Sequence, residues 1–145
     1  TVPPGADGIV FATDGVTLDL NGFTISGPPG EYGLTDASVA RSRIAIRNGN
    51  VNGFSNSVRL MTSNHVVVEN MMLSPQGAAV AVVVGGFSRV QRNTVVGTGL
   101  IQATCPSIVT ENVSDGYITS FVTDSDKQCI RYHNRSLSYG DPISE

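Results

Sequence analysis

Apolar residues recur in pairs along the chain, and the two members of each pair stand five positions apart. The first members follow one another at intervals of 26, 22, 22, 18 and 24 residues; they are Leu20, Ile46, Val68, Val90, Ile108 and Tyr132. Mostly Asn, Gly, Arg and Glu separate the members of a pair. A pattern that repeats at a nearly constant period indicates a repeat architecture, so we interpret the chain as six copies of one unit.

Each unit is predicted to consist of a short strand, a turn of about two residues and a second short strand. Inward side chains on one straight strand are separated by an even number of residues, so a step of five requires a bend. Asn tolerates the left-handed conformation of such a corner, and stacked Asn side chains can hydrogen-bond along the stack. The predicted corner ladder comprises Asn21, Asn48, Asn70, Asn93, Asn112 and Asn134.

A further apolar segment lies outside most of the units, at 9–12, 58–61, 79–84, 100–103 and 117–121. A coil of three strands cannot bury its own apolar face and is stabilised by stacking on its neighbours. Parallel strands joined in this way cross over in the right-handed sense. The sequence therefore predicts an all-β fold, a right-handed parallel β-helix of about six coils with three short strands per coil.

Composition limits the number of domains and the class of partner. The chain has 145 residues, of which 40% are hydrophobic, so we expect a single domain at 1–145 with one core. Within it, 1–7 would cover the N-terminal edge, 8–137 would form the coils and 138–145 a C-terminal tail. A net charge of −3 provides no basic field for nucleic acid. Membrane insertion is not expected either, because no apolar run approaches the ~18 residues that a membrane span needs.

Two segments carry a resemblance to a known family. The stretches DLNGFTISG at 19–27 and RNGNVNGF at 47–54 resemble the opening coils of bacterial right-handed β-helix proteins of the pectin-lyase-like superfamily. The resemblance covers about 8–137 and implies the fold. It does not imply one function, because the superfamily includes pectate lyases, polygalacturonases, alginate epimerases, phage tailspikes and secreted proteins of no assigned activity.

The two cysteines occupy equivalent positions in adjacent units. Cys105 and Cys129 each stand three residues before an anchor of the repeat, Ile108 and Tyr132. Stacked coils would place their Cα atoms ~4.8 Å apart, which is within the range of a disulfide. We predict a disulfide between the last two coils, with a pair of stacked free thiols as the alternative. A disulfide would fit a secreted or otherwise extracytoplasmic protein.

Catalytic candidates are few. The resemblance implies that a lyase would need clustered acidic residues for Ca²⁺ with an Arg or Lys base, whereas a hydrolase would need paired carboxylates. The strongest candidates are Asp124, Asp126 and Lys127, in the loop before the sixth unit. A solvated acidic loop is the simpler explanation of these residues. No cofactor or metal is expected, unless this loop binds Ca²⁺.

The third strand of each coil contains more apolar residues than one buried face can hold. If Val58 points inward, Arg59 points outward, and the run at 79–84 must place about three apolar side chains outward. An apolar outer face is normally covered. The sequence leaves two covers open, a loop such as 27–43 or a second copy of the chain. In the second case the interface would include Arg59, Ala79, Ala81, Val83 and Ile101.

Three functional hypotheses are compatible with the sequence. The favoured one is a non-catalytic, secreted β-helix that serves self-association or contacts carbohydrate. The second is a polysaccharide lyase, hydrolase or epimerase, or a remnant of one. The third is a structural segment of a tailspike or adhesin.

Overall fold

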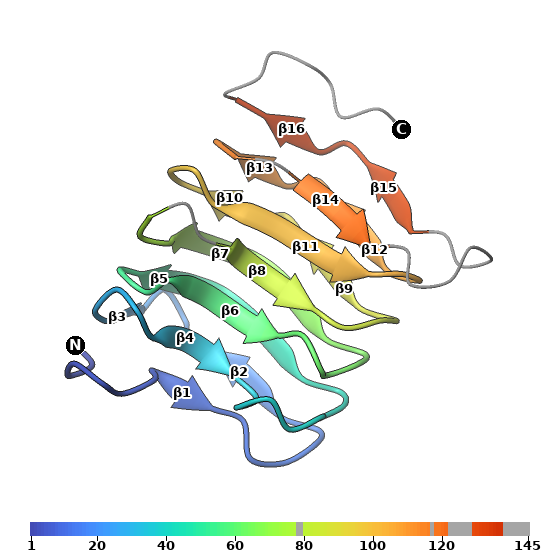
Figure 1. The fold of residues 1–145 in the computed structure, drawn as a ribbon. Coiled ribbons are helices and arrows are strands. Elements are labelled where there is room, and N and C mark those ends of the chain that lie inside the picture. The colour runs from blue at the N-terminus through green and yellow to red at the C-terminus, as the bar shows by residue number, and fades with distance from the viewer. Residues whose placement is uncertain (78–79, 117, 122–128, 138–145) are drawn as a thin grey trace.

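The computed structural model describes residues 1–77, 80–116, 118–121 and 129–137, with backbone alone described at 118–121. Its strands stack into a parallel β-solenoid of about five turns, which confirms the predicted fold class with a slightly lower coil count. The coils wind in the right-handed sense from the N-terminus upward in Figure 1. The described residues form no helix, and so none that could span a membrane.

The third strand of each coil belongs to a six-stranded sheet. Its strands lie in the order β1 (Ile9–Val10), β4 (Tyr32–Thr35), β6 (Asn56–Leu60), β8 (Val80–Val84), β11 (Leu100–Thr104) and β14 (Ile118–Phe121). Every pairing in this sheet is parallel. The sequence pattern missed β4, because Gly33 interrupts its apolar run. A Cβ at Gly33 would overlap both the Val51 side chain and the Ser57 carbonyl oxygen, so the gap in the pattern marks a close approach in the core.

The repeated units form a second sheet of ten strands, again with parallel pairing. In two coils the unit is a single bent strand: β5 (Ala45–Asn52) and β7 (Val67–Ser74). In the others it is divided at the corner, giving β2 (Thr17–Asp19), β3 (Thr24–Ser26), β9 (Arg89–Gln91), β10 (Thr94–Val95), β12 (Ile108–Thr110), β13 (Val113–Ser114), β15 (Ile130–Tyr132) and β16 (Arg135–Ser136). The three strand segments of a coil therefore form two sheets.

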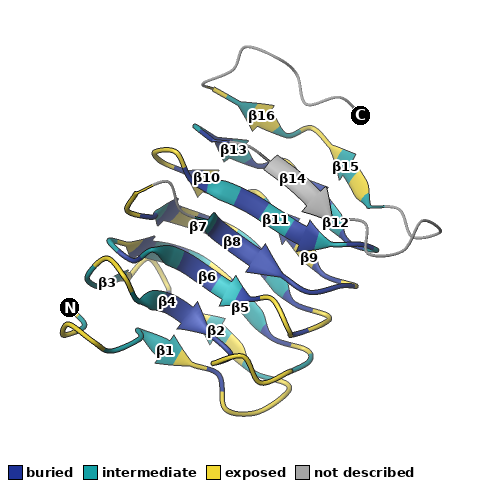
Figure 2. Cartoon of the chain, viewed as in Figure 1, coloured by how far each residue is buried: buried dark blue, intermediate teal, exposed yellow. Residues whose placement is uncertain are grey.

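The core lies between these sheets as rows of side chains in register. One row of the ten-stranded sheet is Leu18, Ile46, Val68, Val90, Val109 and Arg131. Three predicted anchors were displaced from this row, since Leu18, Val109 and Arg131 occupy the places assigned to Leu20, Ile108 and Tyr132. Figure 2 shows the buried middle coils and the exposed terminal strands β15 and β16.

The inward positions become polar toward the C-terminal end. The second inward row of the ten-stranded sheet starts with Ile25, Val51, Leu73 and Val95 but ends with Ser114 and Ser136. No described residue of β15 or β16 belongs to the apolar core cluster. The last coil is therefore held mainly by polar and covalent contacts.

Most of the predicted Asn residues are hydrogen-bonded along the stack, but they form two separate ladders, one on the outside of the coils and one inside. Asn48 and Asn70 adopt left-handed φ values of 60° and 53° at the corner, and their side chains are hydrogen-bonded on the outside of the coil. In the later coils the left-handed corner residues are instead Arg92, Glu111 and His133. The Asn that follows each of these points inward, and the three form a second ladder: Asn93, Asn112 and Asn134.

The inner ladder satisfies buried main-chain groups. The Asn112 side chain donates to the Val90 carbonyl (2.9 Å) and accepts from the Asn93 backbone N–H (3.0 Å). Asn93 donates to the Val68 carbonyl in the same way, at 2.9 Å. A side chain with one donor end and one acceptor end thus links successive coils where a leucine would leave both groups unpaired.

The predicted disulfide is present. Cys105 and Cys129 are bonded, with their Cα atoms 5.0 Å apart. Cys105 directly follows β11 and Cys129 directly precedes β15. The bond joins the turn after β11 to the start of the last coil.

The predicted interface on the third strand is wrong in its three described aliphatic residues, which are all buried. Ala81 and Ile101 are fully buried members of the core. The register between β8 and β11 shifts at Ala81, and the successive residues Ala81 and Val82 are both buried. Val83 is also buried. Arg59 is half-buried, and its guanidinium lies 4.8 Å from the centre of the Tyr32 ring. Ala79 lies outside the described residues.

Candidate functional site

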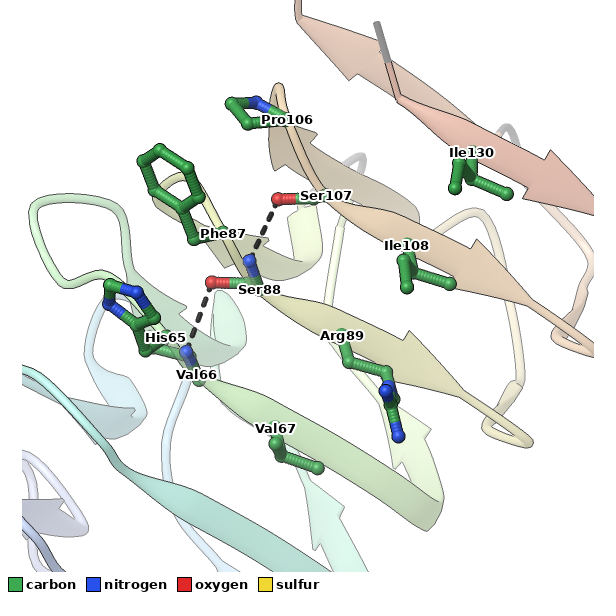
Figure 3. Close-up of a pocket in the computed structure, with 10 residues that line it drawn as sticks. All are labelled: His65, Val66, Val67, Phe87, Ser88, Arg89, Pro106, Ser107, Ile108 and Ile130. Atoms are coloured by element: carbon green, nitrogen blue, oxygen red, sulfur yellow. Dashed lines mark hydrogen bonds between the residues drawn. The ribbon is translucent and has the colours of Figure 1, made fainter.

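A groove of about 580 Å³ runs across the outer face of the ten-stranded sheet, over β7, β9, β12 and β15. Figure 3 shows that its side chains stand in two lines that cross the coils. The first follows the corner before each strand and contains His65, Phe87 and Pro106. The second follows the strands, where register places Val67, Arg89, Ile108 and Ile130 side by side.

The corner line owes its position to backbone conformation. His65 and Phe87 have left-handed φ values of 56° and 57°. Their N–H groups donate to the carbonyls of Gly86 and Pro106 in the next coil, which holds each corner in register. The coil requires a left-handed residue here, but Asn or Gly would adopt that conformation at lower cost than an aromatic residue. The fold therefore explains the left-handed backbone at His65 and Phe87, but it does not explain why both residues carry an aromatic ring.

The two rings form one aromatic surface. They stack with centroids 5.3 Å apart and planes 10° from parallel. Phe87 is 59% exposed, and Ile130 at the far side of the groove is 55% exposed. Exposed apolar side chains gathered in a hollow indicate contact with a ligand or a partner.

The floor of the groove is rigid. The Ser88 hydroxyl accepts a hydrogen bond from the Val66 N–H (3.1 Å) and the Ser107 hydroxyl accepts from the Ser88 N–H (3.0 Å). Both bonds are drawn in Figure 3. Ser88 and Ser107 are buried, so this chain of bonds fixes the spacing of three neighbouring coils beneath the aromatic rings.

Arg89 supplies the charge of the groove. It is exposed between Val67 and Ile108, and within the described part of the chain it makes no ion pair. Its guanidinium is thus available to hydroxyl or carboxylate oxygens of a bound molecule. The groove combines an aromatic platform, an aliphatic wall and one donor group.

Two short ion pairs lie outside the groove, among residues that do not line it. Arg47 pairs with Asp19 at 3.0 Å, and Arg92 pairs with Glu69 at 3.0 Å. The pKa of Asp19 is lowered from its ordinary value of 3.8, first by the backbone N–H of Asn21 and then by the Asn48 side chain, against a smaller opposing effect of desolvation.

The predicted catalytic loop cannot be compared with the groove, because Asp124, Asp126 and Lys127 lie outside the described residues. The only fully buried carboxylate that the described ranges contain is Asp36. It accepts hydrogen bonds from the hydroxyls of Thr62 (2.8 Å) and Ser63 (2.7 Å). Asp36 therefore anchors the loop after β4 to the next coil.

Metal ligands are not grouped in the part of the chain that the structure describes: no three His, Cys, Asp or Glu side chains come together there. His65 and His133 lie on different coils and serve different contacts, since His65 stacks on Phe87 and His133 packs edge-on against Tyr132.

Sequence reasoning missed the groove. Ile108 was assigned to the inward anchor row, whereas register with Arg89 and Ile130 places it on the outer face. The signal that could have revealed the site is the recurrence of a ring residue at the same position of two successive units. His65 and Phe87 are 22 residues apart, and each stands two residues before a strand. A scan of protein-family models, a search of curated proteins and a search of solved structures each found no match for this chain.

Proposed function

We propose that this chain is an extracytoplasmic β-helix of the pectin-lyase-like type that binds a carbohydrate chain, without catalysis, in the groove over β7, β9, β12 and β15. The observation that carries the proposal is the stacked pair of His65 and Phe87 at a corner that does not call for aromatic residues. Such a platform accepts the C–H face of a sugar ring. Arg89 then donates to its oxygens.

The geometry of the solenoid supports a linear ligand. Successive coils repeat at ~4.8 Å, so the corner line presents side chains at regular steps across three coils and the strand line across four. A glycan chain is itself a regular repeat of rings with one apolar face and polar edges. The disulfide between Cys105 and Cys129 supports an extracytoplasmic location, where such glycans are met.

The test is binding of the purified protein to a panel of soluble polysaccharides that includes xylan, a β-glucan and polygalacturonate, followed by calorimetry. Replacing Phe87 with Ala should weaken the affinity for a bound glycan about tenfold, because it removes the exposed ring. Phe23→Ala is the matched control, since Phe23 is 73% exposed and does not line the groove. The proposal fails if no glycan binds, or if both variants lose affinity equally.

Self-association is the second candidate, and a different observation favours it. Ile130, Tyr132 and Leu137 are exposed large apolar residues on the last described coil, whose outer strand edge has no neighbour among the described strands. An apolar edge of this kind is a template for a second copy. Light-scattering chromatography separates the candidates: a dimer or trimer would favour self-association, and a monomer that binds glycan would favour the groove.

A further inference from the structure

The disulfide connects two segments that line the groove. Cys105 directly precedes Pro106, Ser107 and Ile108, and Cys129 directly precedes Ile130. Pro106, Ser107 and Ile108 form one wall at this end of the groove, and Ile130 forms the other, which we call the outer wall. The disulfide joins the two walls covalently, one residue before the first lining residue of each.

Apart from the disulfide, the outer wall is held by hydrogen bonds and little buried apolar surface. The Asn134 side chain donates to the Val109 carbonyl (2.7 Å) and accepts from the Asn112 backbone N–H (3.1 Å). β15 pairs with β12 over three residues, and β16 pairs with β13 over two. At the inward position, where other coils place an aliphatic side chain, β15 carries Arg131. Ile130 is mostly exposed, and its described backbone contact is the hydrogen bond from its N–H to the Ser107 carbonyl (2.9 Å). A terminal coil with so little buried apolar surface opens readily once its covalent link is cut.

We infer that the Cys105–Cys129 disulfide controls the groove: oxidised protein presents a complete groove, and reduction releases the Ile130 wall and removes that end of the binding surface. The inference rests on the proposed function only for the identity of the ligand. The redox dependence of the groove itself follows from the position of the disulfide beside the lining residues.

The reductant is a dithiol. One of its thiolates attacks the sulfur of Cys129, the less buried of the two cysteines, and the Cys105 sulfur leaves as a thiolate and takes up a proton. The second thiol of the reductant then attacks the mixed disulfide and releases the Cys129 thiol. Two electrons pass from the dithiol to the cystine, and the dithiol becomes a cyclic disulfide.

Amide hydrogen exchange of the intact protein, with and without dithiothreitol, tests the structural step. The N–H groups of Ile130 and Arg135, which bond to the carbonyls of Ser107 and Asn112, should exchange at least about tenfold faster after reduction. The amides of β5 and β7 should not change, because those strands lie in the middle of the solenoid. Unchanged protection of Ile130 would overturn the inference, and so would loss of protection throughout the chain, which would mean global unfolding.

Binding tests the functional step. The affinity for a glycan that the oxidised protein binds should fall about tenfold or more on reduction. A Cys105→Ser, Cys129→Ser double variant should match the reduced protein and should not respond to dithiothreitol. If the oxidised protein binds no glycan, the proposed function fails, while the exchange experiment still decides the redox dependence. Equal affinity of the oxidised and reduced proteins would refute the inference even if the glycan binds.

Discussion

Replacing Asn112 with Leu should remove more stability than any exposed Asn substitution in this chain. Asn112 is fully buried, and its side chain bonds to two main-chain groups, the Val90 carbonyl and the Asn93 N–H. Leu has a similar branched shape and keeps water out, so neither group gains a substitute partner.

The magnitude follows from those two groups. A buried polar group left without a partner costs about 1–3 kcal/mol, so the variant should lose about 2–6 kcal/mol of unfolding free energy. Asn50→Leu is the matched control, because Asn50 lies on the outer face and its side chain makes solvent-exposed bonds to the Gly22 carbonyl and the Thr24 hydroxyl. The control should change stability by less than about 0.5 kcal/mol.

Urea unfolding followed by far-ultraviolet circular dichroism measures both variants. With a slope of about 1–3 kcal/mol per molar, the Asn112 variant should unfold at a midpoint lower by about 1 M or more. Coils contact only their neighbours, so amide exchange should locate the damage in β9, β12 and β15. If the two variants lose equal stability, the inner ladder contributes nothing and the reasoning is refuted.

Three more predictions concern other features. Replacing both Cys105 and Cys129 with Ser should lower the unfolding free energy by about 3 kcal/mol, because the bond spans 24 residues, and thermal unfolding without reductant would show it; an unchanged Tm would contradict this. Gly49→Ala should cost about 1–3 kcal/mol of unfolding free energy, because the new Cβ would overlap the Leu20 side chain. Gly86→Ala should be nearly neutral, because the nearest atom to its new Cβ is 3.7 Å away. Chemical denaturation compares the two variants, and equal losses of stability would disprove the packing argument. The pKa of Asp19 is lowered in the folded state, so its contribution to stability is full at neutral pH and is lost as the pH falls below about 3.8; an NMR titration that places its midpoint at or above that value would be the contrary result.

The repeat was predictable from sequence because stacking makes every coil obey the same constraint. Ile46, Val68 and Val90 are inward in register, as the spacing indicated. Leu18 and Leu20 are both aliphatic, as are Ile108 and Val109, so the spacing alone could not decide between them. In the last coil the inward residue is the polar Arg131, and the apolar Tyr132 was taken in its place.

The Asn positions show why sequence alone could not resolve the corner. Asn suits the left-handed corner itself, as at Asn70, and equally suits the next position, where Asn93 points inward and bonds to a carbonyl. One residue of displacement changes the face completely. The same difficulty hid the groove, since assigning Ile108 to the core removed it from the outer line that it shares with Arg89 and Ile130.

The position of the disulfide also has a mechanical consequence. A force that pulls strands away from the C-terminal end breaks the hydrogen bonds of one coil at a time, because each coil is bonded only to the next. Peeling of this kind needs little force at any moment. Among the described strands, β16 would detach first and β15 next. β15 and β16 follow Cys129 in the chain and can still peel, but the Cys105–Cys129 bond then passes the load directly to the turn after β11 and removes it from the segment between the two cysteines. Oxidation would therefore limit unzipping from this end to the two described strands that follow Cys129, until the turn after β11 itself gives way.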